Sequence, residues 1–146
     1  MTAASGIHVW LVLMKAHRTL SRLAEESIEA LDMCFSDFAV LELLLHKGGQ
    51  PVNAIGKRVN LTSGSITTAV DRLEERGLVE RGLDESDRRA RIVSLTKRGR
   101  ARITEVFAAH ERAMGRAAAG LGPRERATLV HLLKKLGTTA EKGTSS

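Results

Sequence analysis

Small hydroxyl side chains are concentrated in one segment near the middle of the chain. Within seven residues it carries Thr62, Ser63, Ser65, Thr67 and Thr68. Successive residues of a helix are rotated by about 100° around its axis. If this segment is a helix that ends near Arg76, its apolar residues form one inward stripe, and the hydroxyls and Arg72 remain accessible. Such an uncrowded polar face can enter a DNA major groove about 12 Å wide and hydrogen-bond to base edges or phosphates. The helix N-terminus adds backbone N–H groups that attract phosphate.

The same hydroxyls have a simpler interpretation. Ser and Thr are common in the first turn of surface helices because they cap the unpaired N–H groups there. Thr62 or Ser63 could serve that purpose alone. The DNA interpretation therefore depends on the segment that comes after the helix.

A basic hairpin is predicted directly after it. Gly77 ends the helix, residues 78–81 and 92–95 have the composition of two short strands, and a turn lies around residues 84–88. From Arg81 to Arg102 there are 8 Lys/Arg and 3 Asp/Glu. Arginines at a hairpin tip suit the narrow, negative minor groove of A·T-rich DNA. The candidates are Arg88, Arg89 and Arg91.

Asp87 lies beside these arginines and is not expected to touch phosphate, because like charges repel. It could orient Arg89 through a charge-assisted hydrogen bond across the tip. An exposed ion pair that contributes about 0–1 kcal/mol to stability is equally compatible with the sequence.

The net charge of +6 is unevenly distributed. Residues 57–102 hold 12 Lys/Arg against 7 Asp/Glu, whereas residues 1–56 hold 4 against 6. The excess coincides with the predicted helix and hairpin, as expected for a phosphate-binding surface. Charge alone would also fit a solvated basic face.

Three further helices precede this unit. Apolar spacing predicts a long helix over residues 7–31, and a second one with Ser36 as its N-cap that stops at Lys47-Gly48-Gly49. Pro51 indicates a break in the chain, and a short helix comes next over residues 52–59. Helices followed by a basic hairpin are the order of a winged helix-turn-helix domain.

Two amphipathic helices close the chain, from residue 103 to about 119 and from Gly122-Pro123 to Leu136. Their apolar sides could pack within one monomer or between two subunits, which periodicity does not distinguish. Residues 137–146 carry little apolar surface and are predicted to form a loose tail without a function of its own.

The chain resembles the MarR family of transcriptional regulators from about Ile7 to Leu136. The family's wing motif, Asp-x-Arg, five residues, then Leu-Thr, is matched by Asp87-Arg88-Arg89 followed by Leu95-Thr96. Further likeness lies in FAVLELLLHKG at residues 38–48, in residues 70–74 and in Gly77-Leu78-Val79. FAVLELLLHKG and the run at residues 63–67 are most similar to the quinone- and catechol-responsive branch of the family.

The resemblance implies a mainly α fold with a small β-hairpin wing, forming one domain over residues 1–136. Residues 36–100 would be the winged helix-turn-helix lobe, and residues 7–31 and 101–136 would interlock as dimerisation helices. A homodimer would present paired lobes to a palindromic operator in double-stranded DNA. We expect a repressor released by a small aromatic ligand or an oxidant.

A phenolic or quinone effector is expected beside the first helix, which in this family helps to wall a pocket. The candidate side chains are Trp10, Met14, His17 and Cys34. Trp10 is also a natural core residue. Cys34 could sense oxidants, but the acidic Asp32 and Asp37 nearby favour a buried, inert thiol.

Other classes of function find less support. The zinc-responsive branch has paired His ligands where this chain has His110 and Met114, so no metal or other cofactor is expected. No phosphate loop or nucleophile elbow points to an enzyme. The single cysteine, with no signal peptide and no membrane-length apolar segment, favours a reduced cytoplasmic protein. The alternatives are a zinc-responsive regulator and a winged helix used only for protein contacts, and the basic charge disfavours the second.

Overall fold

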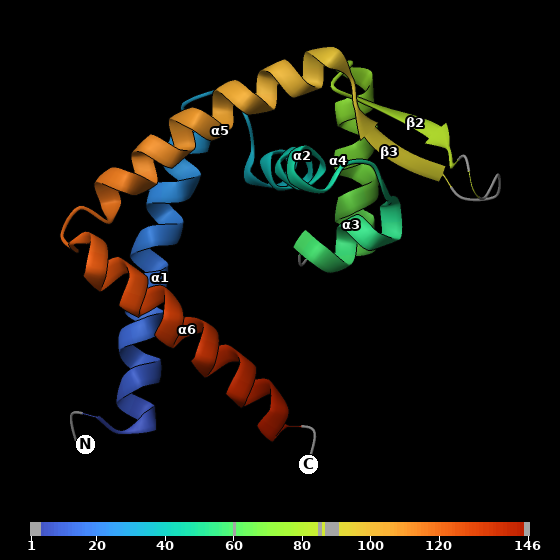
Figure 1. Cartoon of the computed structure of the whole chain (residues 1–146). Coiled ribbons are helices and arrows are strands. Elements are labelled where there is room, and N and C mark those ends of the chain that lie inside the picture. The colour runs from blue at the N-terminus through green and yellow to red at the C-terminus, as the bar shows by residue number, and fades with distance from the viewer. Residues whose placement is uncertain (1–3, 60, 85, 87–90, 145–146) are drawn as a thin grey trace.

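The structure is a computed structural model that describes residues 4–59, 61–84, 86 and 91–144. Its elements in chain order are α1 Gly6–Glu29, α2 Phe35–Lys47, β1 Gln50–Pro51, α3 Val52–Val59, α4 Ser63–Glu75, β2 Val79–Leu83, β3 Arg91–Leu95, α5 Lys97–Ala117 and α6 Pro123–Gly143. Figure 1 shows α2, α3, α4 and the β2–β3 hairpin gathered into one lobe. The long helices α1 and α5 run away from that lobe, and α6 folds back from the far end of α5. The predicted mainly α fold with a winged helix-turn-helix is confirmed.

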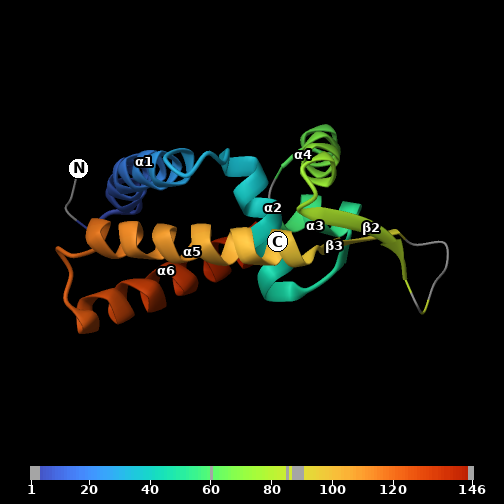
Figure 2. The ribbon, with the colours of Figure 1, turned by 90° about the horizontal axis from the view of Figure 1, so that it is seen from above.

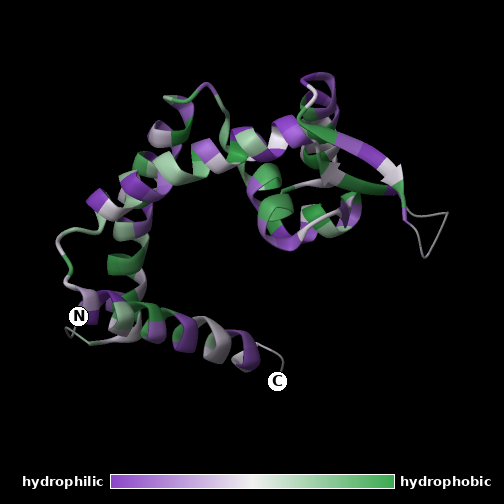
Figure 3. Ribbon diagram, turned by 45° about the horizontal axis from the view of Figure 1, so that its top comes forward, coloured by the Kyte–Doolittle hydropathy of each residue, from purple (hydrophilic) through white to green (hydrophobic). Residues whose placement is uncertain are grey.

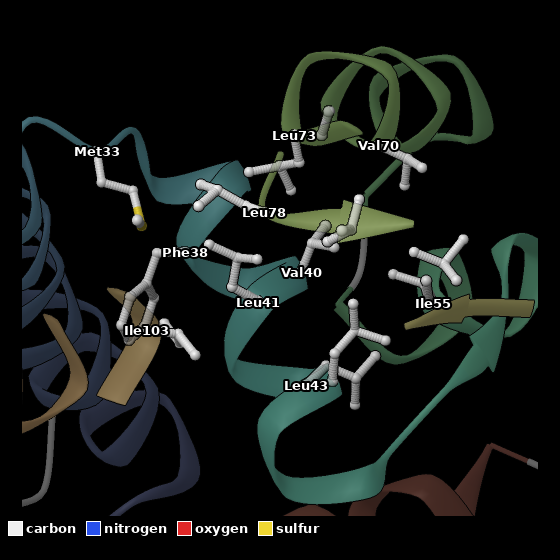
Figure 4. Close-up of a cluster of buried hydrophobic side chains, with 14 of the residues drawn as sticks. Met33, Phe38, Val40, Leu41, Leu43, Ile55, Val70, Leu73, Leu78 and Ile103 are labelled. Atoms are coloured by element: carbon white, nitrogen blue, oxygen red, sulfur yellow. The ribbon is translucent and has the colours of Figure 1, made fainter. Parts of the chain in front are cut away.

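The hydrophobic core lies inside the lobe and is centred on α2, which is flanked by α3, α4 and α5. Val40, Leu41 and Leu44 of α2 are almost completely buried, and they pack in one cluster with the inward stripe of α4 (Figure 4). Burying each such aliphatic side chain contributes about 1.5–3 kcal/mol to folding. Because the apolar stripe of α4 must cover this core, the packing also determines which residues of α4 face outward.

A three-stranded antiparallel sheet completes the lobe in the order β1-β3-β2. The predicted hairpin is present, with Val79 opposite Leu95 and Leu83 opposite Arg91. The third strand was not predicted: Pro51, interpreted from sequence only as a break, pairs with Ile92. A two-residue edge strand leaves no periodic pattern, and an edge position tolerates proline because it requires fewer N–H donors.

The start of α5 is tied to the turn after α4. Thr96 caps α5 by accepting a hydrogen bond from the Gly99 N–H (2.9 Å) and donates its own proton to the Gly77 carbonyl (2.6 Å). Gly99 lies so close to the preceding turn that a Cβ there would be 1.8 Å from the Leu78 carbonyl oxygen. The Leu-Thr pair of the wing motif thus ends the hairpin and begins a helix, which starts six residues before the sequence expectation at residue 103.

Two other boundaries differ from expectation. Ser36 does not cap α2: the extended backbone residue is Cys34, and the Ser36 hydroxyl lies 3.3 Å from the Cys34 sulfur instead. The predicted tail from Gly137 is wrong over its first seven residues, because α6 continues to Gly143. No proline interrupts this stretch, and the good helix formers Ala140, Glu141 and Lys142 extend it.

The helix α6 and the first half of α1 leave much of their apolar surface uncovered. Every residue of α6 is exposed, and so is every residue from Val9 to Leu20 in α1 (Figure 3 shows the apolar positions along both helices). Seen from above in Figure 2, α1 and α5 extend away from the lobe, and α6 runs back toward it. In the described part of the chain, no helix combines the length and apolarity needed to cross a membrane.

Candidate nucleic-acid interface

The surface that the sequence singled out is built on α4. Thr62 is its N-cap, as predicted: the hydroxyl accepts a hydrogen bond from the Ser65 N–H (3.2 Å) and donates one to the Ser65 hydroxyl (2.9 Å). Ile66, Ala69, Val70 and Leu73 are the buried side of the helix. The exposed side carries Ser63, Gly64, Ser65, Thr67, Thr68 and Asp71.

The two threonines of this face differ from its serines. Thr67 donates its hydroxyl proton to the Ser63 carbonyl (2.9 Å), and Thr68 donates its proton to the Gly64 carbonyl (3.0 Å). Their hydroxyls therefore face the helix backbone. In the sequence all five hydroxyl groups of residues 62–68 look equivalent, because side-chain torsions leave no trace in composition.

Arg72, predicted as a DNA contact, is held by a partner inside the protein. Its Nε donates to Asp37 Oδ2 (3.1 Å), its Nη2 donates to Asp37 Oδ1, and the Cys34 sulfur lies 3.5 Å from Nη2. Asp37 is 1% exposed, and Arg76 approaches the same carboxylate at 3.7 Å. The hydrogen bond to Asp37 raises the pKa of Arg72 above its already high ordinary value, although burial opposes this. The Arg72 side chain is 41% exposed, so its outer edge still reaches solvent.

A second clamp connects α4 to the hairpin. Arg81 of β2 donates one hydrogen bond to Asp71 (2.6 Å) and another to Glu74 (2.8 Å), both on α4. The bond to Asp71 is the main reason why the pKa of Arg81 is raised. Arg81 was not singled out from the sequence, in which it counts only toward the basic charge. The signal in the sequence that could have indicated its role is the pair of acids Asp71 and Glu74, which lie one turn apart on α4.

The hairpin projects from the lobe beside α4 (Figures 1 and 2). Arg91 begins β3 and is exposed. The predicted tip residues Asp87, Arg88 and Arg89 lie outside the described residues. The structure therefore places the predicted helix face and the base of the predicted wing at one end of the molecule.

Comparison with known proteins identifies this arrangement. Residues 36–90, the lobe from α2 to the hairpin, match the model of the MarR family. The chain is 32% identical to the HTH-type transcriptional regulator MhqR of Bacillus subtilis over 94% of each protein. The chain belongs to the MarR family of transcriptional regulators.

Solved MarR-family structures have the same fold. A mutant MarR from E. coli, complexed with operator DNA, superposes with a TM-score of 0.75 at 26% identity, covering 88% of this chain and 92% of that one. BpsR of Bordetella bronchiseptica, in a structure that concerns regulation of its DNA binding by 6-hydroxynicotinic acid, gives a TM-score of 0.76 at 26% identity over 94% and 96%. In both comparisons the matched part of this chain is much longer than the lobe and therefore includes residues of the long helices.

The predicted effector residues of this MarR-family protein do not all meet within one chain. Trp10, Met14 and His17 lie one turn apart on α1, where Trp10 is 55% exposed and Met14 41% exposed. At about 1.5 Å per residue, Trp10 is roughly 28 Å from the end of α1. Cys34 lies beyond that end, so a small ligand cannot touch both in a monomer.

Cys34 is exposed at the N-terminus of α2 rather than buried, which contradicts the expectation of a buried thiol. In the turn before it, between α1 and α2, Asp32 adopts a left-handed φ of 57°. Among the described residues of this MarR-family protein, no three His, Cys, Asp or Glu side chains converge on a common point that could hold a metal ion.

Proposed function

We propose that this MarR-family protein is a sequence-specific DNA-binding repressor that acts as a homodimer in the cytoplasm. The observation that carries the proposal is the exposed hydroxyl face of α4, fixed by Arg81 to a basic hairpin. The α4 helix, hereafter the recognition helix, would enter the major groove. The hairpin, hereafter the wing, would place Arg88, Arg89 and Arg91 in or beside the minor groove.

The dimer is supported by apolar surface that one chain leaves uncovered. In α6, Leu129, Leu132, Leu133 and Leu136 form a stripe with each side chain at least 40% exposed, and the first half of α1 exposes Ile7, Trp10, Leu11 and Met14. Apolar area of this extent on a soluble monomer marks an interaction site. Residues 1–136 would form one domain in which α1, α5 and α6 pair two chains, so that the recognition helices meet palindromic half-sites about one DNA turn apart.

Release of DNA would follow binding of a small aromatic ligand, a phenol or quinone, or an oxidant. Regulation of BpsR by 6-hydroxynicotinic acid supports an aromatic effector in the same fold. Trp10, Met14 and His17 supply a flat ring, a polarisable sulfur and a hydrogen-bonding ring to such a compound. Because Cys34 lies far from them within one chain, these residues could share a ligand only if a partner's α2 approaches α1.

The test is fluorescence polarisation across a salt series, with the DNA that flanks the protein's own gene and a panel of phenols and quinones. Tight, specific and compound-sensitive binding would support the repressor. Arg89→Ala should weaken binding and flatten the salt dependence by about one phosphate contact per subunit. Salt-sensitive binding without sequence preference would contradict specific regulation, and no binding would favour a protein-interaction module.

A further inference from the structure

The recognition helix offers two chemically different groups to DNA. Ser65 accepts a hydrogen bond from Thr62 at 2.9 Å, which leaves the serine's own proton for an acceptor outside the protein. Thr67 and Thr68 have already donated their protons to backbone carbonyls one turn earlier. A threonine hydroxyl bonded in this way keeps only acceptor capacity.

The position of the hydroxyl decides which chemical group these threonines present to DNA. Each Cβ carries one hydroxyl and one methyl, and with the hydroxyl against the helix the methyl is the group left toward solvent. Thr68 is on the side of the helix opposite the buried stripe, one turn after Gly64. Gly64 has no side chain, and a Cβ built there would meet no heavy atom within 4 Å, so the surface one turn before Thr68 is open.

Thr67 borders a groove between α3 and α4. The other lining residues are the apolar Val52, Gly56, Leu61 and Ile66 and the polar Asn53, Lys57 and Ser63. The surface beside Thr67 on the α3 side is therefore mostly apolar and can accommodate a methyl group.

We propose that Thr67 and Thr68 are specificity-determining residues that recognise thymine through its C5 methyl group. This inference rests on the proposed DNA-binding function. The thymine methyl is the one apolar group on a base edge in the major groove, and threonine methyls are among its usual partners. Ser65 supplies hydrogen-bond recognition, and the two threonines supply contact with methyl groups.

The experiment first selects a duplex from a random-sequence library with the wild-type protein and then replaces its thymines one at a time by deoxyuridine, which lacks only the methyl. Loss of one buried methyl contact corresponds to about a fourfold rise in Kd. At one or more positions of each half-site, the wild-type protein should show this rise. A selected sequence in which no uridine substitution changes Kd would overturn the inference while leaving the proposed function intact.

Two matched variants assign the effect to a side chain. Thr68→Ser keeps the hydroxyl and its bond to Gly64 but removes the methyl, so at the position that Thr68 reads it should bind the thymine and uridine duplexes equally. Thr68→Val keeps the methyl and removes the hydroxyl, so it should retain the fourfold preference. The opposite pattern would show that the hydroxyl reads the base. The same pair at Thr67 locates the second contact, and a selection that enriches no sequence would contradict the proposed function itself.

Discussion

The carboxylate of Asp37 on α2 is buried beneath the guanidinium of Arg72 on the recognition helix. Two hydrogen bonds join them, and Arg76 approaches the same carboxylate at 3.7 Å. A planar guanidinium that bonds both carboxylate oxygens fixes direction as well as distance. The pair therefore sets the orientation of α4 relative to the core helix α2.

Removing Arg72 should destabilise the protein more than removing its partner's charge. Arg72→Ala leaves a buried carboxylate without its two hydrogen bonds and with only the longer Arg76 contact of 3.7 Å, at a cost of about 2–4 kcal/mol. In Asp37→Asn, the partly exposed Arg72 can turn to solvent, so the loss should be about 1–2 kcal/mol. Urea unfolding measures both values.

Arg58→Ala on the exposed surface of α3 is the control for loss of an arginine and should change stability by less than about 0.5 kcal/mol. Equal stability of Arg72→Ala and Arg58→Ala would mean that the Asp37 contact contributes nothing to folding.

Gly99→Ala should be strongly destabilising although alanine favours helices. Its Cβ would lie 1.8 Å from the Leu78 carbonyl oxygen and 2.8 Å from the carbonyl carbon, so backbone must move. Overpacking against a rigid neighbour costs about 1–3 kcal/mol or more. Thermal unfolding should show a lower Tm.

Gly115→Ala lies in the same helix with no heavy atom within 4 Å of the added Cβ. It should raise stability by about 0.5–1 kcal/mol through helix propensity. If both alanine variants gained stability, the close contact between α5 and the turn after α4 would be incorrect.

The stability of the protein should fall as the pH is lowered through 6.5, in part because of His110. Burial lowers the pKa of His110 from its ordinary 6.5, against the opposing charge of Glu42, so the unfolded chain takes up the proton more readily. The contribution is present above pH 6.5 and is lost as the pH falls toward the lower folded pKa. Urea unfolding at pH 7.5 and 5.5 measures the loss.

His110→Gln keeps a hydrogen-bonding group near Ser27, which lies 2.9 Å from the ring, but cannot titrate. This variant should lose less stability between the two pH values than the wild type does. His131→Gln on the exposed α6 should match the wild type, and an unchanged pH dependence in His110→Gln would exclude the ring as its source.

A charge in the apolar stripe of α6 should prevent dimerisation. Leu132→Lys places an ammonium group where the proposed partner covers the leucine, which is 53% exposed in one chain. Light scattering after size exclusion should show a monomer and a loss of at least tenfold in DNA affinity, since two linked half-sites bind more tightly than one.

Thr138→Lys adds the same charge to the other side of α6 and should leave the dimer intact. A Leu132→Lys protein that remains dimeric would move the interface away from this stripe.

Local sequence patterns were sufficient for most elements of the lobe. Thr62 was found as a cap because its hydroxyl type and the apolar spacing after it are both local. The helix over residues 52–59 and the hairpin were found for the same reason. The strand at Gln50–Pro51 was missed, because its only evidence is the partner strand some forty residues later.

The functional residues likewise fall into those that local patterns reveal and those whose role depends on contacts between elements. The sequence located the hydroxyl face, but it gave no sign that Arg72 is paired with Asp37, and it wrongly assigned Cys34 to the interior. Asp37 and Cys34 meet Arg72 only after α2 packs against α4, and a contact across 35 residues leaves no periodic trace. Arg81 likewise becomes a clamp only when β2 lies beside α4.

The sequence by itself therefore determined the order of the elements, the apolar stripe of each helix and the location of the positive charge, since these depend on residues a few positions apart. The tertiary structure decided which charged groups are already paired, as Arg72 is with Asp37 and Arg81 is with Asp71 and Glu74. Those pairs depend on distances of about 3 Å between side chains on different elements, which only the packed chain fixes.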